Sequence, residues 1–171
     1  MGFLNKLFNK STENAETSVF TSGTIRSPFT GQVLPLSDVS DPVFAQELMG
    51  KGIAFEPTDG EVLSPINGTV VMLFDTYHAI GLKSDEGIEI LIHVGMDTVE
   101  LKGKGFAPCV KTGDRVSIGD CLIEVDLAFV QEMGYSIITP MVIMNTNEYT
   151  TIEPTTVGHV TAGDDVLVVS K

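Results

Sequence analysis

Two histidines, His78 and His93, flank a short polar turn, "SDEG" at residues 84–87. His93 interrupts the apolar run "IEILIHV", where a strand would usually carry an aliphatic or β-branched residue. If the segments on either side pair as a hairpin with a two- or four-residue loop, His78 lies directly opposite His93, with Cβ atoms about 4.5–5.5 Å apart. A three-residue loop with Gly87 as a bulge would change this register.

Two imidazoles this close resist double protonation, so one nitrogen stays free as a nucleophile or ligand while a neighbouring N–H can donate. Zinc usually needs three or four protein ligands, and His159 has no short spacing to the pair. Acid–base hydrolysis would need a Ser or Cys nucleophile in a recognisable motif, which the sequence lacks. Phosphoryl transfer needs mainly alignment and charge stabilisation, which two imidazoles could supply. The remaining alternative is a pair of surface histidines without a chemical role.

The strand that carries His93 separates its residues into two faces, because successive side chains of a strand alternate. Leu91 and His93 share one face, which ends at Gly95. That face predicts an accessible surface with an apolar patch. The opposite face is aliphatic and predicts the core: Ile88, Ile90, Ile92 and Val94.

The rest of the sequence consists mostly of short strand patterns separated by turn signals, which predicts an all-β fold. We expect an antiparallel β-sandwich or barrel-sandwich hybrid with short helical segments. "SPFTGQV" at 27–33 is echoed by "SPINGTV" at 64–70, and Gly-Asp pairs recur at 113–114, 119–120 and 163–164. Two short helices are expected, one from the cap Asp41 to Gly50 and one from Asp126 to Gly134.

The beginning of the chain differs in character from the rest. Residues 1–18 read as a flexible tail, and residues 19–171 as a single folded domain. Within residues 1–10, apolar side chains beside Lys6 and Lys10 would suit a helix lying on an anionic membrane, or the segment is a frayed end. No secretory signal or run of about 18 apolar residues occurs, so a cytoplasmic location is expected.

The net charge of −13 and the pI near 4.4 argue against a nucleic-acid partner, because binding phosphates requires clustered Lys and Arg. An acidic surface would instead suit a basic protein partner. The two cysteines, Cys109 and Cys121, form no CxxC pair. They are expected to be buried free thiols in a reducing cytosol.

The segment "HAIGLKSDEGIEILIHVGMDTVELKGKGF", residues 78–106, resembles the signature of the glucose-type (type 1) IIA components of the bacterial phosphoenolpyruvate-dependent sugar phosphotransferase system. Every fixed position is present, including "HVGMDTVEL" from residue 93 and "GKGF" from residue 103. The resemblance extends upstream through "DPVFAQELMGKGIAFEPTDGEVLSPINGTV" and downstream through "GDRVSIGDCLIEVD". It implies a β-sandwich and a phosphotransferase component that works through a phosphohistidine.

By this resemblance, the chain would accept a phosphoryl group from the histidine phosphocarrier protein on His93. It would then donate the group to a cysteine on the IIB domain of a glucose-type sugar permease. His78 would support the phosphate, Thr76 would orient His78, and Asp97 would be an acidic residue beside the site. The family's docking surface, an apolar patch ringed by acidic groups, maps to Asp41, Val43, Phe44, Met49, Phe74 and Leu91.

The sequence departs from the family at Leu91 and Val94, where many members carry Phe. No cofactor is expected to be required. Some members bind zinc through the two histidines and a carboxylate of a partner, which implies an interface zinc at His78 and His93. Unphosphorylated members inhibit permeases or enzymes in some bacteria, so a regulatory binding protein that uses the same surface is an alternative.

Two other classes share elements of the pattern. Biotinyl and lipoyl carrier domains need a lysine at a hairpin tip, and neither Lys83 nor Lys111 has that setting. A zinc peptidase of similar fold would need an H-x-H element, which "GHVT" at 158–161 lacks.

Overall fold

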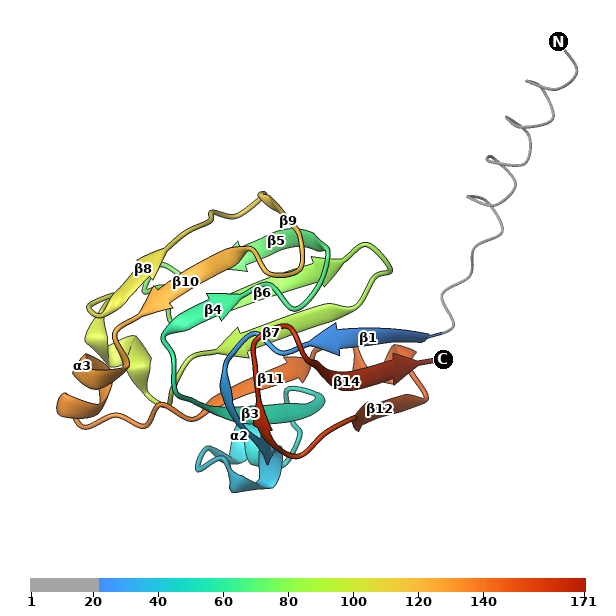
Figure 1. The fold of residues 1–171 in the computed structure, drawn as a ribbon, viewed down its shortest axis with the longest axis horizontal. Coiled ribbons are helices and arrows are strands. Elements are labelled where there is room, and N and C mark those ends of the chain that lie inside the picture. The colour runs from blue at the N-terminus through green and yellow to red at the C-terminus, as the bar shows by residue number, and fades with distance from the viewer. Residues whose placement is uncertain (1–21) are drawn as a thin grey trace, which may run out of the picture.

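The computed structural model describes residues 22–171, and every strand pairing in this range is antiparallel (Figure 1). The predicted all-β sandwich with short helical segments is confirmed. The expected tail, residues 1–18, and the expected domain start at residue 19 lie outside the described residues. Within the described range, no helix has the length and apolar character needed to span a bilayer.

Within residues 22–171 the strands form three sheets. The largest has eight strands in the order β13 (Gly158–Val160), β2 (Gly31–Pro35), β3 (Lys51–Pro57), β11 (Thr139–Ile143), β7 (Glu89–His93), β6 (Ala79–Ser84), β5 (Gly68–Leu73) and β9 (Arg115–Val116). One three-stranded sheet contains β1 (Ser22–Arg26), β14 (Asp165–Ser170) and β12 (Thr151–Pro154). The other contains β4 (Glu61–Leu63), β10 (Cys121–Val125) and β8 (Phe106–Pro108).

Two hydrophobic clusters stabilise this arrangement. The main core contains the four aliphatic side chains predicted on one face of the strand at 88–94, and all of them are buried. A second, smaller cluster includes Leu91 on β7 and Ala79 on β6, together with Phe44 from the segment after β2. The other face of β7 is therefore covered at Leu91, and the predicted accessible surface is confined to the neighbourhood of His93, which is half-buried.

The three Gly-Asp pairs form the same turn three times. In each turn the glycine has a positive φ of 91–96°, which is costly for a residue with a Cβ. Each aspartate then binds the residue three positions earlier, donating its N–H to that carbonyl and accepting that N–H with its carboxylate. The three pairs are Asp114 with Lys111, Asp120 with Ser117, and Asp164 with Thr161.

These turns are also attached to the sheets in the same way. Each exchanges two backbone hydrogen bonds with one residue, and these residues are Val70, Ser64 and Ser27. Ser27 and Ser64 begin the two echoed segments, and each buried hydroxyl donates to the carbonyl two residues on. Both sequence echoes therefore reflect one local structure used repeatedly.

Both predicted helices form with their predicted caps. Asp41 accepts the N–H of Val43 at 2.9 Å at the start of α2 (Pro42–Ala45), and Asp126 accepts the N–H of Phe129 at 3.0 Å at the start of α3 (Leu127–Glu132). The helix α3 ends before Gly134 as predicted. The expectation for α2 was too long, because Glu47 adopts a left-handed φ of 58° ahead of Gly50. The described part of the chain also contains three 3₁₀ turns: η1 (Leu36–Asp38), η2 (Thr98–Leu101) and η3 (Thr146–Glu148).

The prediction of buried free thiols is wrong. Cys109 follows β8 and is exposed, Cys121 begins β10 and is half-buried, and the two form a disulfide. The pairing arises because β8 and β10 are antiparallel neighbours, and the N–H of Cys109 donates to the carbonyl of Leu122. Nothing in the local sequence around either cysteine predicts that β8 and β10 are neighbouring strands.

Candidate active site

The hairpin of β6 and β7 differs by one residue from the expected register. Ser84 donates its N–H to the carbonyl of Ile88 at 2.8 Å, which leaves a three-residue loop that ends at Gly87 with φ 100°. This is the alternative loop considered above, and it pairs Ala79, not His78, with His93. The expectation that the two histidines lie directly opposite one another is therefore wrong.

The two imidazoles nevertheless meet, because His78 precedes the regular part of β6. Tyr77 adopts a left-handed φ of 58° and donates its N–H to the carbonyl of Phe74, so the chain turns before the strand begins. His78 accepts the N–H of Val94 at 2.7 Å through its carbonyl, which holds it beside β7. The two ring centroids lie 4.9 Å apart with the rings nearly perpendicular.

The protonation of the His93 ring is determined by a backbone carbonyl. Its Nδ1 lies 2.8 Å from the oxygen of Gly95. A carbonyl can only accept, so Nδ1 carries the proton and Nε2 keeps its lone pair. Gly95 has a φ of 72°, and a Cβ there would lie 2.6 Å from the carbonyl oxygen of Ser136 and 2.7 Å from a methyl carbon of Thr98. Only glycine fits at this position.

Gly95 is itself held by Thr139, which the sequence analysis did not identify. The fully buried Thr139 hydroxyl accepts the N–H of Gly95 at 3.1 Å and donates to the carbonyl of Ile137 at 2.9 Å. Thr139 therefore fixes the peptide whose carbonyl orients His93. A polar residue at the start of the otherwise apolar strand "TPMVI" is the signal that could have drawn attention to it.

His78 is 4% exposed, and its Nδ1 lies 2.6 Å from the hydroxyl oxygen of Thr76. Burial, and then the nearby His93, lower the pKa of His78 from 6.5 to about 4. Burial also lowers the pKa of His93, against the hydrogen bond to Gly95 and the charges of Asp41 and Asp97, which act to raise it. Both rings are therefore neutral at pH 7.

Aromatic rings flank the histidines on both sides. The Phe44 ring lies 5.2 Å from the His93 ring, and the Phe74 ring lies 5.5 Å from the His78 ring, measured between centroids. Phe44 belongs to α2 and Phe74 follows β5 directly. The two phenyl rings contribute to the burial of the imidazoles, and burial is the largest cause that lowers both pKa values.

The family described as the phosphoenolpyruvate-dependent sugar phosphotransferase system, EIIA 1, matches residues 23–149. The chain belongs to this family. The glucose-specific EIIA component of Oceanobacillus iheyensis is 46% identical over 145 residues, covering 85% of this chain and 88% of that protein. The corresponding component of Staphylococcus epidermidis is 43% identical over 163 residues, covering 95% of each chain.

Two further relatives extend the comparison. The beta-glucoside-specific EIIBCA component of Bacillus subtilis is 46% identical over 146 residues, which cover 85% of this chain and 24% of that protein. The solved structure of glucose permease IIA from Mycoplasma capricolum superposes with a TM-score of 0.81 at 35% identity, covering 86% of this chain and 95% of that one. Membership in the EIIA family assigns the chain a phosphocarrier role in sugar transport, as a transferase of the phosphotransferase system.

The residues that the resemblance assigned to partner binding in this EIIA protein differ in exposure. Val43, Met49 and Phe74 are 38–40% exposed, whereas Phe44 and Leu91 are each only 6% exposed and belong to the second cluster. The exposed three can contact a partner directly, and the buried two support the surface from below.

Two acidic residues lie close enough to His93 to affect its pKa. Asp41 is half-buried at the cap of α2, and Asp97 is exposed with a left-handed φ of 60°. Exposed apolar side chains that the sequence analysis did not assign lie on the same segments: Leu48 after α2, Met72 on β5 and Val99 in η2. Leu48 and Val99 lie outside strands, and Met72 is exposed because a register shift after Val70 interrupts the alternation in β5, so no alternating pattern marked these residues.

A metal at the histidine pair would need a ligand from elsewhere. Among residues 22–171, the one group of three or more His, Cys, Asp or Glu side chains spaced to hold an ion is Cys109, Cys121 and Glu124. The histidine pair gathers no third such group within the described range, so a zinc ion there would have to be completed by a partner. The interface zinc stays a prediction.

We predict that Thr139→Val loosens the Gly95 peptide and shifts part of His93 to the tautomer protonated on Nε2. The isosteric valine removes both hydrogen bonds, and leaving the buried N–H of Gly95 unpaired costs about 1–3 kcal/mol, whereas the half-buried carbonyl of Ile137 costs less. Nitrogen-15 NMR of the imidazole at neutral pH measures the tautomer directly. Thr139→Ser keeps the hydroxyl and should retain the original tautomer; equal spectra for the two variants would exclude a positioning role for Thr139.

We also predict that the free energy of unfolding falls between pH 7 and pH 5 partly through His78. Because the pKa of His78 is near 4 in the folded chain and 6.5 in its ordinary state, the unfolded chain binds more protons in this window. Above pH 6.5 His78 is neutral in both states and does not lower the free energy of unfolding. As the pH falls below 6.5, protonation of the unfolded chain lowers the free energy of unfolding, by about 2 kcal/mol at pH 5. Urea unfolding of the original chain and of His78→Gln at both pH values measures it: the variant should lose less stability, and identical losses would contradict the assignment.

Proposed function

We propose that the chain accepts a phosphoryl group from the histidine phosphocarrier protein on Nε2 of His93 and donates it to a cysteine of a IIB domain of a sugar permease. The observation that carries the proposal is the hydrogen bond between His93 and Gly95, which leaves Nε2 unprotonated next to a second neutral imidazole. We place this exchange in the cytoplasm.

The acceptance step requires no net proton transfer. The lone pair of His93 Nε2 attacks phosphorus in line with the P–N bond of the donor's phosphohistidine, and that bond breaks with its electron pair returning to the donor ring. His93 keeps its proton on Nδ1, and its ring becomes more positive as the new N–P bond forms. The Gly95 carbonyl supports this change, because a hydrogen bond from a charged donor is stronger than one from a neutral donor.

His78 supports the phosphoryl group from the side. If the Thr76 hydroxyl donates to Nδ1 of His78, the proton of that ring resides on Nε2 and is available to a phosphoryl oxygen. The low pKa of His78 keeps this ring neutral, so it serves as a hydrogen-bond donor and does not compete with His93 for a second proton. Thr76 thus acts as the positioning residue for His78.

The surroundings suit a labile phosphohistidine and a basic donor. Phe44 and Phe74 pack against the imidazoles, and a partner seated on Val43 and Met49 would exclude further water during transfer. Asp41 and Asp97, within a chain of net charge −13, would attract a basic partner and raise the association rate. The Bacillus subtilis relative is an EIIBCA component, which supports an EIIB domain as the acceptor.

We predict that incubation with phosphoenolpyruvate, the first enzyme of the system and the phosphocarrier labels the chain with an acid-labile, base-stable phosphate. His93→Ala should abolish the label, because the unprotonated nitrogen of the remaining His78 is the Nδ1 that is engaged by Thr76. His159→Ala is the matched control, since His159 is exposed on β13 and should be dispensable. Label that survives His93→Ala, or no label on the original chain, would reject the proposal.

We further predict that His78→Gln still accepts phosphate but passes it to a IIB domain about 100-fold more slowly, because one donor to the phosphoryl oxygens is lost. Single-turnover measurements with phosphorylated chain and isolated IIB domain separate this step from acceptance. Normal onward transfer in His78→Gln would contradict the division of roles between the two histidines.

A further inference from the structure

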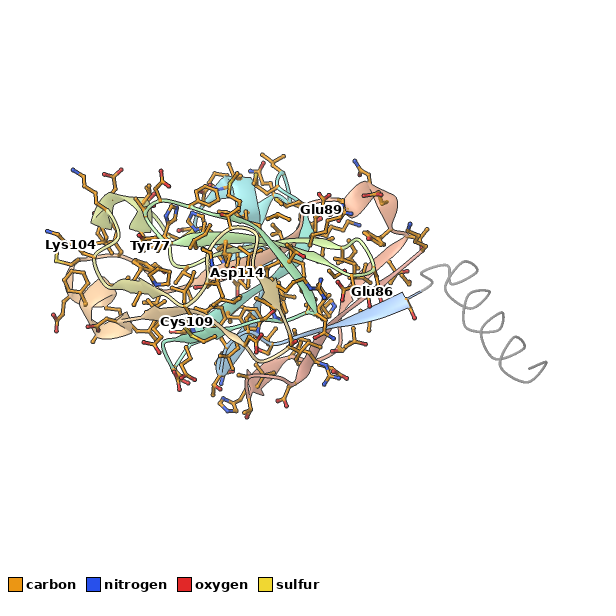
Figure 2. All side chains as sticks on the ribbon, turned by 90° about the horizontal axis from the view of Figure 1, so that it is seen from above. Tyr77, Glu86, Glu89, Lys104, Cys109 and Asp114 are labelled. Atoms are coloured by element: carbon orange, nitrogen blue, oxygen red, sulfur yellow. A yellow bond between two sulfur atoms is a disulfide. The ribbon has the colours of Figure 1, made fainter. Side chains whose placement is uncertain are left out.

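The disulfide lies on the sheet of β4, β10 and β8, apart from the histidine pair on the eight-stranded sheet. Figure 2 shows the sandwich from a second direction, with Tyr77 and Glu89 toward one face and Cys109 toward the other. The two cysteines come from neighbouring antiparallel segments with Cα atoms 5.8 Å apart. The phosphotransfer chemistry proposed above does not use them.

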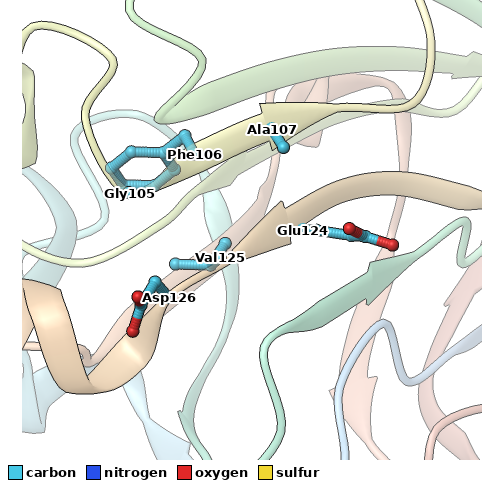
Figure 3. Close-up of a pocket in the computed structure, with 6 residues that line it drawn as sticks. All are labelled: Gly105, Phe106, Ala107, Glu124, Val125 and Asp126. Atoms are coloured by element: carbon cyan, nitrogen blue, oxygen red, sulfur yellow. The ribbon is translucent and has the colours of Figure 1, made fainter.

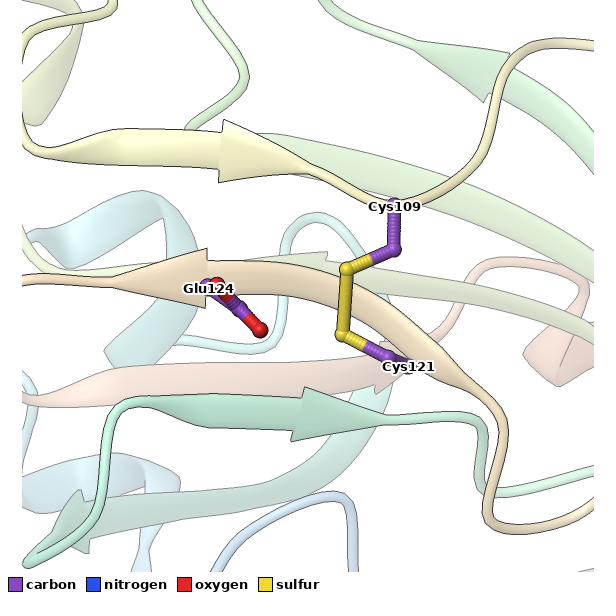
Figure 4. A group of neighbouring side chains, drawn as sticks. All are labelled: Cys109, Cys121 and Glu124. Atoms are coloured by element: carbon purple, nitrogen blue, oxygen red, sulfur yellow. A yellow bond between two sulfur atoms is a disulfide. The ribbon is translucent and has the colours of Figure 1, made fainter.

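A bulge in β10 brings a third group to the cysteines. The register against β4 shifts between Cys121 and Ile123, so that the consecutive residues Leu122 and Ile123 are both buried. Glu124 therefore returns to the outer side, beside Cys121 (Figure 4). One carboxylate oxygen of Glu124 and the two Sγ atoms all lie within 4.8 Å of one another.

We propose that, when the disulfide is reduced, Cys109, Cys121 and Glu124 bind one thiophilic divalent cation of the Zn²⁺ class. Two thiolates and one carboxylate are a donor set that such a cation accepts, whereas Mg²⁺ and Ca²⁺ prefer oxygen alone. The three ligand atoms already lie within 4.8 Å of one another, and tetrahedral binding requires the two sulfurs to separate after the S–S bond is broken.

The chemistry balances with a dithiol as reductant. The dithiol supplies two electrons and two protons, becomes a disulfide itself, and leaves two thiols on the chain. Binding of the cation then releases both thiol protons, because the thiolate is the ligand. Metal binding and disulfide formation are consequently mutually exclusive states of the same two sulfurs.

The site is open to reductant and metal. Cys109 is exposed, and Glu124 also lines a pocket of about 440 Å³ between β8 and β10, with Gly105, Phe106, Ala107, Val125 and Asp126 (Figure 3). The open side leaves the fourth coordination position to a water molecule or an outside ligand. Both the disulfide and the bound cation would link the two ends of the loop 109–121. This loop is hydrogen-bonded to β5 at Val70 and Leu73.

Cobalt(II) titration of the fully reduced, full-length chain tests the proposal, because thiolate-bound cobalt gives a charge-transfer band in the near ultraviolet that histidine-bound cobalt does not. We expect one cobalt per chain, displacement by Zn²⁺, and no band in the oxidised chain. Cys109→Ser and Cys121→Ser should each weaken binding and reduce the intensity of the band.

The carboxylate is tested separately with a matched pair of variants. Glu124→Gln should lower the cobalt affinity about 10-fold or more. Glu61→Gln should leave the affinity unchanged, since Glu61 lies opposite Glu124 on β4 but outside the group of three. No thiolate band in the reduced chain, an undiminished band in Cys109→Ser, or equal affinity for Glu124→Gln and the original chain would overturn the assignment.

Discussion

The hydrogen bond from His93 Nδ1 to the carbonyl of Gly95 is the constraint on which the site depends. An imidazole free in water exchanges its proton between two nitrogens, and only the unprotonated one is a nucleophile. The carbonyl removes that choice because it cannot donate. The carbonyl can occupy this position only because residue 95 has no Cβ, and because the Thr139 hydroxyl holds the same peptide through its N–H.

Burial acts on both histidines, but their surroundings separate them. His78 experiences two effects that lower its pKa, desolvation and the neighbouring His93. For His93 desolvation is opposed by the Gly95 carbonyl and by the carboxylates of Asp41 and Asp97. The more basic ring is therefore the one with the free Nε2, and the less basic ring is the one held by Thr76. Two chemically identical side chains acquire different roles through the groups that surround them.

Local patterns in the sequence predicted the parts of the fold that local forces determine. The core face of β7, both aspartate caps and the repeated Gly-Asp turns follow from alternation, capping and positive φ, each of which is decided within a few residues. The hairpin register was wrong by one residue because "SDEG" is compatible with loops of several lengths, and only the conformation of Gly87 decides among them. The left-handed conformation of Tyr77 brings His78 beside His93 in spite of the shifted register. Nothing about a tyrosine at this position predicts that conformation.

Other features escaped because they depend on segments distant in the sequence. Thr139 reaches Gly95 from a different strand, and the cysteines meet only because β8 and β10 are neighbours. The exposure of a side chain also depends on distant segments. Phe44 and Phe74 look alike in the sequence, yet Phe44 is buried in α2 whereas Phe74, in the turn after β5, is accessible. Patterns within a strand identify its faces, but they do not reveal what the rest of the chain places over each face.

The repeated turns explain how a small chain can hold two imidazoles in a fixed relation. One Gly-Asp turn is attached at Val70 in the middle of β5, and another at Ser64 shortly before it, so that the strand leading to His78 is fixed by backbone bonds along its length. The turn at Phe74–Tyr77 then begins from a rigid strand, and His78 accepts a bond from Val94 immediately after His93. The geometry of the pair is thus set by main-chain contacts, whereas exposed side chains such as Val43 and Met49 can vary to suit a partner without disturbing it.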